Sequence, residues 1–161
     1  MKYLYLTLIL ATMNSFGQLV KVDYADGNQK LEGFFAKAQK ANPKKVGVIV
    51  LPAWMGVDAH AKESAKNLSK LGYHAFVADI YGVGNNPKNT GEAGKNAGFY
   101  KNNPAEYQKR IQLAIDQLVK AGADKNQIAV IGYCFGGTGA IEAARGNLNV
   151  KGVVSFHGGL G

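Results

Sequence analysis

The chain has 161 residues, of which 47% are hydrophobic and 19% charged, a composition typical of one globular domain. This excludes disordered, collagen-like and disulfide-rich proteins, and the single cysteine excludes an intrachain disulfide and any multi-cysteine metal site. Lysine and arginine outnumber aspartate and glutamate by 19 to 11, and the simplest explanation is a surface of solvated lysines. With two arginines and no recognisable binding module, the sequence predicts no nucleic-acid partner.

Residues 1–17 have the pattern of a secretory signal peptide. A short positive start is followed by an uncharged apolar run over residues 3–13, and small residues stand at the −3 and −1 positions of a cleavage site before Gln18. The run is too short to span a membrane, and no later run approaches the ~20 apolar residues that a span needs. We therefore expect residues 18–161 to be exported to the periplasm or the medium, with no membrane partner after the signal is removed. The alternative is a buried N-terminal strand.

Hydrophobic periodicity and turn signals predict alternating strands and helices. Asp26-Gly27 between two strand-like runs indicates a hairpin, and the continuous apolar run at 46–51 is typical of a strand buried on both faces. Asp58 is expected to cap one helix, and Asn103 and Pro104 to begin another. In chain order the predicted elements are strands at 19–24, 31–38 and 46–51, a helix from Asp58 to Leu71, a strand at 73–78, a helix from Asn103 to Gly122, a strand at 128–132, a helix at 136–145 and a strand at 150–156.

One segment has no clear period. Residues 82–103 are rich in glycine, asparagine and lysine, and we expect a long irregular loop there, of a kind that is often functional. Its lysines are expected to be solvated rather than to form a binding surface.

The alternation of strands and helices predicts an α/β fold with a mostly parallel sheet and helices on both faces. In such sheets, ligands bind at the carboxyl ends of the strands. Candidate residues are therefore those just after positions 51, 78, 132 and 156.

The segment Gly132-Tyr133-Cys134-Phe135-Gly136-Gly137 follows a predicted strand and opens a predicted helix. A nucleophile exposed at such a sharp bend needs small residues two places on either side, because neighbouring backbone comes close. The positive end of the helix dipole would favour the thiolate of Cys134. Two alternatives are a small buried cysteine in a glycine-rich turn and a dinucleotide-binding turn, although the latter lacks its third glycine and its acidic residue.

Five segments in the same order resemble the dienelactone hydrolase family of α/β-hydrolases. They are Val22-Asp23-Tyr24 with Leu31-Glu32-Gly33-Phe34, Val50-Leu51-Pro52-Ala53-Trp54-Met55-Gly56, Leu71-Gly72-Tyr73 with Asp79-Ile80-Tyr81-Gly82, Gly132-Tyr133-Cys134-Phe135-Gly136-Gly137, and Ser155-Phe156-His157-Gly158-Gly159. The resemblance covers nearly all of residues 18–161.

The resemblance implies a Cys–His–Asp hydrolase of esters or lactones, with Cys134 as the nucleophile. It places the oxyanion donors at the backbone N–H groups of Phe135 and Trp54. Ala53, Tyr133 and His157 would lie around the pocket. No metal and no organic cofactor is implied.

The chain departs from the family pattern in three ways. The family's catalytic aspartate and histidine would follow Gly161, so we expect a partial domain that lacks the C-terminal strands, from a fragment or a truncated reading frame. Ala53 stands where many members have a glutamate near the cysteine, and Val83 stands where the archetype has a substrate-binding arginine. His157 is the alternative general base within the chain.

These departures leave two functions open. One is a thiol-dependent hydrolase that is complete only in a longer chain, and the other is a non-catalytic relative that binds small molecules at the same place. The last predicted strand would lie at a sheet edge with Val153, Val154 and Phe156 partly exposed, which predicts self-association through that edge.

Overall fold

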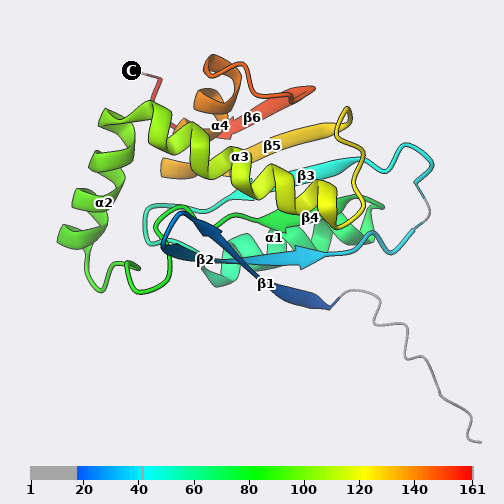
Figure 1. Cartoon of the computed structure of the whole chain (residues 1–161), viewed down its shortest axis with the longest axis horizontal. Helices are drawn as coiled ribbons and strands as arrows, with labels where there is room; N and C mark the ends of the chain where they lie inside the picture. Colours follow the sequence, from blue (N-terminus) through cyan, green and yellow to red (C-terminus); the bar gives the residue numbers. More distant parts are fainter. Residues whose placement is uncertain (1–17, 41, 161) are drawn as a thin grey trace, which may run out of the picture.

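A computed structural model describes residues 18–40 and 42–160, so the predicted signal peptide lies outside the described residues. Six strands form one sheet in the order β1-β2-β4-β3-β5-β6 (Figure 1). The hairpin of β1 (Leu19–Asp26) and β2 (Gln29–Ala36) is antiparallel, and β2 runs antiparallel to β4. The other four strands are mutually parallel: β3 (Gly47–Leu51), β4 (His74–Val77), β5 (Ile128–Tyr133) and β6 (Gly152–Phe156).

Helices pack on both faces of this sheet, as predicted. One face is covered by α1 (Ala59–Lys70), whose Ala61 and Ala65 pack against Val50 and Val77. The other face is covered by α3 (Pro104–Lys120) and α4 (Phe135–Arg145), and α2 (Thr90–Asn102) extends this layer beyond the sheet (Figure 1). The fold is therefore α/β with a six-stranded, mostly parallel sheet. No helix in the part of the chain described by the structure is long and apolar enough to cross a bilayer.

The helix signals explain where two of these helices begin. The Asp58 carboxylate accepts a hydrogen bond from the Ala61 N–H at 2.8 Å and so caps α1, as expected. Asn103 precedes Pro104 at the start of α3, but its side chain does not cap that helix and instead donates to the Phe99 carbonyl at 2.8 Å. The predicted apolar stripe of α3 is fully confirmed, because Tyr107, Ile111, Ala114, Ile115 and Leu118 are all buried.

The prediction of an irregular loop over residues 82–103 is wrong, because residues 90–102 form α2. The Asn89 side chain accepts from the Glu92 N–H at 2.9 Å, and the Glu92 carboxylate accepts from the Lys88 N–H at 2.8 Å. These two bonds fix the first turn of the helix. The buried residues Ala93, Ala97 and Tyr100 follow helical spacing, but two of the three are alanines, so the apolar period is faint in the sequence.

Strand β6 is an edge strand in the described sheet, paired only with β5. Val154 and Phe156 have 48% and 42% of their surface exposed, as predicted for an uncovered edge, and Val153 is half-buried. Self-association through this edge stays a prediction.

His74, the first residue of β4, makes the stability of the fold depend on pH. Its Nδ1 accepts a hydrogen bond from the Ala38 N–H at 3.4 Å, so the imidazole is neutral. Partial burial, followed by the positive charges of Lys37 and Lys45, lowers the pKa of His74 below its ordinary value of 6.5.

The folded protein therefore holds this proton less tightly than the unfolded chain does. We expect the free energy of unfolding to rise with pH between the lowered pKa and about 6.5, and to lose this contribution below that interval. Urea unfolding at a series of pH values should show a smaller slope over this interval in the His74→Gln variant. An unchanged slope in the variant would assign the pH dependence to other groups.

Candidate active site

Cys134 is the single residue between the end of β5 and the start of α4, at the carboxyl edge of the parallel strands. Its backbone has φ 53° and ψ −114°, a region that residues with a Cβ rarely adopt. The bend is held by two backbone hydrogen bonds, because the Cys134 N–H donates to Phe156 at 2.9 Å and its carbonyl accepts from Thr138 at 3.2 Å. Cys134 is a free cysteine, and the residue is partly exposed.

The two glycines that flank Cys134 at a distance of two residues are required by close packing. A Cβ at Gly132 would overlap the carbonyl group of Gly136, and a Cβ at Gly136 would overlap the carbonyl group of Leu51. The sharp strand-to-helix turn that the sequence predicts is therefore present, with backbone passing directly against backbone.

The strand register brings three loops together beside Cys134. Leu51 pairs with Gly132, and Gly132 pairs with Ser155, so the segments after β3, β5 and β6 begin at the same edge of the sheet. The loop after β3 is a tight turn in which the Gly56 N–H donates to the Ala53 carbonyl at 3.0 Å, with Gly56 at φ 85°. The backbone N–H groups of Trp54 and Phe135 form no hydrogen bond within the described part of the chain.

Tyr81 fixes the turn that contains Trp54, a contact that sequence reasoning missed. The Tyr81 hydroxyl donates to the Trp54 carbonyl at 2.9 Å, and its ring stacks on Phe135 at a centroid distance of 5.5 Å. Burial raises the pKa of Tyr81, and the neighbouring Tyr100 and Cys134 add to this effect, so the phenol stays protonated and able to donate at neutral pH. The signal in the sequence that could have identified Tyr81 is its position just after a buried strand, within Asp79-Ile80-Tyr81-Gly82.

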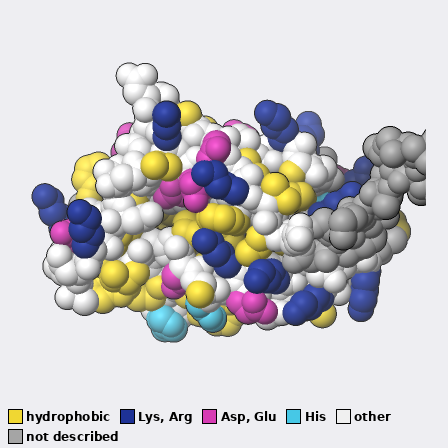
Figure 2. All heavy atoms as spheres, turned by 90° about the horizontal axis from the view of Figure 1, so that it is seen from below, with side chains coloured by type: hydrophobic (Ala, Val, Ile, Leu, Met, Phe, Trp, Pro, Cys, Tyr) yellow, Lys and Arg dark blue, Asp and Glu magenta, His cyan; other side chains and the backbone are white. Residues whose placement is uncertain are grey.

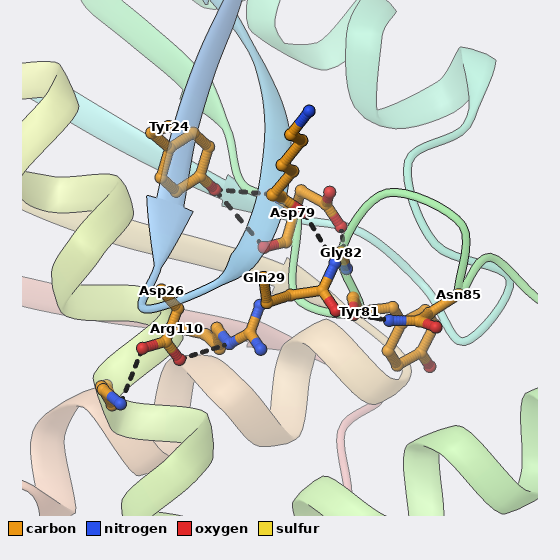
Figure 3. A network of polar contacts seen from close by, with 10 residues as sticks. Tyr24, Asp26, Gln29, Asp79, Tyr81, Gly82, Asn85 and Arg110 are labelled. Atoms are coloured by element: carbon orange, nitrogen blue, oxygen red, sulfur yellow. Dashed lines mark hydrogen bonds and ion pairs between the residues drawn. The ribbon is translucent and has the colours of Figure 1, made fainter.

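Tyr81 is itself held by the polar network shown in Figure 3. The Asp79 carboxylate accepts from the backbone N–H groups of Glu32 at 3.0 Å and Gly82 at 2.8 Å, and the Asn85 amide donates to the Tyr81 carbonyl at 3.1 Å. Burial raises the pKa of Asp79, although these backbone donors and Arg110 oppose the shift. Asp79 is buried, and its carboxylate holds this loop through these hydrogen bonds, so its role is structural.

A pocket of about 270 Å³ lies between Tyr81 and α2, and Cys134 is not among the residues that line it. Its walls are the aromatic side chains of Tyr81, Phe99 and Tyr100 with the polar side chains of Asn85, Lys95 and Asn96. Such a mixture of apolar walls and few polar groups suits a small organic ligand. Sequence reasoning missed this pocket because it took the α2 segment for a loop.

The other predicted pocket residues lie near the bend, with different contacts. The Tyr133 ring stacks on Phe156 at 4.8 Å and meets the edge of His60 at 4.6 Å, so His60 also lies close to the bend. His157 follows β6 with φ 47°, and its exposed side chain has no hydrogen bond or ring contact within the described residues. No histidine or carboxylate in the described ranges, residues 18–40 and 42–160, is hydrogen-bonded to Cys134.

Comparison with known proteins matches residues 31–160 to the model of the dienelactone hydrolase family. Two solved structures superpose with TM-scores of 0.82 and 0.81 over 89% of this chain: a protein named m3DLH, 32% identical, and a dienelactone hydrolase-like promiscuous phosphotriesterase from metagenomic libraries, 34% identical. A curated Bradyrhizobium sp. protein, "Probable 2-oxo-3-(5-oxofuran-2-ylidene)propanoate lactonase", is 28% identical over 99 residues, or 61% of this chain.

The chain is shorter than these relatives. It spans 60% of the length of each of the two solved structures and 40% of the curated Bradyrhizobium protein. The matched part, residues 31–160, nevertheless contains the parallel strands β3 to β6, most of β2 and the bend at Cys134. The chain belongs to the dienelactone hydrolase family.

Proposed function

We propose that this chain carries the nucleophilic part of a hydrolase of carboxylic esters or lactones, with Cys134 as the nucleophile. The observation that carries the proposal is the backbone of Cys134, held at φ 53° between a strand and a helix. Beside it, the N–H groups of Trp54, on the loop after β3, and Phe135, at the start of α4, form no hydrogen bond within the described residues. A strained, over-determined residue of this kind is typical of catalytic positions. The family match supports an ester or lactone substrate.

The chemistry follows from these groups. The Cys134 thiolate attacks the carbonyl carbon, a C–S bond forms, and the carbonyl electrons move to the oxygen, which the N–H groups of Trp54 and Phe135 would bind. When the carbonyl re-forms, the C–O bond of the ester breaks and the alkoxide or phenolate leaves with the bonding pair. Hydrolysis of the resulting thioester needs a base to activate water, and the family's histidine and aspartate have no counterpart bonded to Cys134 in the described residues.

We therefore expect acylation without efficient turnover from residues 1–161 alone. Mixing the chain with p-nitrophenyl acetate should release about one equivalent of nitrophenolate rapidly and then continue slowly, because deacylation lacks its base. Prior alkylation with iodoacetamide should remove the rapid phase. Sustained turnover that survives alkylation would contradict the proposal.

A second candidate function is non-catalytic binding of a small molecule. It is favoured by the pocket against α2 and by the absence, within the described ranges, of a base bonded to Cys134. Saturable binding of an aromatic ester with no acylated protein in the mass spectrum would support this alternative over the hydrolase.

The contact between Tyr81 and the Trp54 carbonyl gives a sharper prediction. Tyr81→Phe removes this hydrogen bond, so the oxyanion donor on the same turn loses its fixed position, and we expect acylation by p-nitrophenyl acetate to slow about 10-fold. Alkylation by iodoacetamide, which develops no oxyanion, should keep its rate.

Tyr100→Phe is the matched control, because the Tyr100 hydroxyl makes no hydrogen bond within the described residues and its ring stays in the same cluster. Its acylation rate should stay within about 2-fold of the wild type. If both reactions slow together in Tyr81→Phe, the hydroxyl supports the thiol itself and not the Trp54 turn.

A further inference from the structure

The net positive charge of the protein is confined to one edge of the sheet. The amino edge, where β3, β4, β5 and β6 begin, carries eight exposed lysines and one acidic side chain, Asp124. The rest of the described residues carry ten basic and ten acidic side chains. The lysines are scattered along the sequence, so this separation is made by the fold.

Four of these lysines surround the connection between β2 and β3. Lys37 and Lys40 follow the end of β2, and Lys44 and Lys45 precede β3. A groove of about 570 Å³ is lined by Lys37, Lys40 and Lys45 together with His74. No ion pair is formed by these lysines within the described residues, so their charges are not neutralised by the protein.

The other four lie where helices end and strands begin. Lys70 ends α1 and Lys120 ends α3, both at the amino edge because these helices run opposite to the strands. The Lys151 N–H donates to the carbonyl of Ile128 at the start of β5, and the Lys125 carbonyl accepts from Asn149 at 2.9 Å. Figure 2 shows basic side chains at the right-hand end of the molecule, the end at which β3 begins in Figure 1.

Exposed aliphatic side chains lie among these charges. Leu71, next to Lys70, has 67% of its surface exposed, and Val20 has 55% exposed. Val20 lies at this edge because Leu19 pairs with Ala36, the last residue of β2. Strand β1 therefore begins at the lysine-rich edge.

We propose that the amino edge is a docking surface for an anionic lipid bilayer, a partner that the sequence by itself did not predict. Unpaired lysines attract anionic headgroups, and aliphatic side chains between them can enter the headgroup region. Among the described residues, this edge has lysines but no arginine and no exposed aromatic side chain. That composition favours a lipid surface over a nucleic acid. Docking here leaves Cys134, at the opposite edge, open to solvent, and the proposal is independent of the hydrolase assignment.

Vesicle flotation with the 161-residue chain tests whether the amino edge binds anionic lipid. Binding should be much stronger to phosphatidylcholine vesicles that contain phosphatidylglycerol than to pure phosphatidylcholine, and the difference should shrink with added salt. A variant with Lys37→Gln, Lys40→Gln and Lys45→Gln should lose about 100-fold of the binding to anionic vesicles. The apolar run 3–13 affects both kinds of vesicle, so the comparison isolates the charge-dependent part.

The matched control changes the same number of charges at the opposite edge. Lys88→Gln, Lys95→Gln and Lys101→Gln together should weaken binding less than about 3-fold. Equal losses in the two triple variants, or equal binding to neutral and anionic vesicles, would overturn the proposal.

A soluble polyanion is distinguished by two further measurements. Leu71→Ser should weaken binding to anionic vesicles about 5-fold, because it removes apolar surface from the contact, and should leave binding to heparin unchanged. Tight binding of heparin or duplex DNA that depends on Lys37, Lys40 and Lys45, with no preference for anionic vesicles, would replace the lipid by a soluble polyanion. Acylation of Cys134 should be unchanged in Leu71→Ser and in the triple variant at Lys37, Lys40 and Lys45, which lie away from the bend.

Discussion

Replacing Cys134 by alanine is expected to remove the rapid release of nitrophenolate from p-nitrophenyl acetate. The burst of about one equivalent should disappear, because the C–S bond cannot form and only the backbone N–H groups remain to promote slow attack by water. Stopped-flow absorbance measures the rate, and mass spectrometry of peptides from the wild-type protein should find the acetyl group on Cys134.

Serine at the same position provides the control for shape. Cys134→Ser keeps a side chain of similar size at φ 53°, but its hydroxyl stays protonated without a neighbouring base, so acylation should also fall by about 10³-fold or more. Both variants should unfold at the same denaturant concentration within a small margin. An unchanged rapid phase in Cys134→Ala would show that another residue, such as a surface lysine, takes the acetyl group.

Alanine at Gly132 or Gly136 is expected to destabilise the fold by about 3 kcal/mol or more. The new Cβ would overlap the backbone of Gly136 in the first case and that of Leu51 in the second, and neither carbonyl belongs to a flexible side chain that could move away. Relieving the overlap would separate α4 from β5 or from the end of β3. Urea unfolding followed by circular dichroism measures the change.

Gly94 and Gly98, in α2, are the matched controls. A Cβ at either position meets no atom within 4 Å apart from its chain neighbours and the nearby backbone of its own helix. Alanine there should raise the free energy of unfolding by about 0.5–1 kcal/mol, because it removes conformational freedom from the unfolded chain. Equal stability of Gly136→Ala and Gly94→Ala would show that the turn around Cys134 is less tightly packed than the structure indicates.

The position of the nucleophile candidate was predictable because its signals are local. A run of six residues contains the strand end, the cysteine and the glycines on both sides. Close backbone contact at the bend requires these small residues, independently of the rest of the fold. The same is true of Asp58, whose side chain bonds three residues along the chain. The alternation of strands and helices was sufficient to predict a mostly parallel sheet with helices on both faces.

Features that depend on contacts between distant segments could not be predicted in this way. Apart from Phe99, helix α2 has only small or polar residues outside its short buried stripe, and Phe99 is itself half exposed. Its packing therefore becomes visible only when Tyr100 meets Tyr81 and Tyr107. The Tyr81 hydroxyl finds the Trp54 carbonyl 27 residues away, a pairing that no local pattern specifies.

The sequence by itself therefore determined the fold class, the family resemblance and the bend that carries Cys134, since each rests on periodicity or on residues within a few positions of one another. The tertiary structure decided what surrounds that bend and how charge is distributed. Strand register brought Trp54, Phe135 and His157 to one edge and gathered the unpaired lysines at the other. The physical reason is that register and helix direction, which are set by packing across the whole core, fix which distant residues become neighbours.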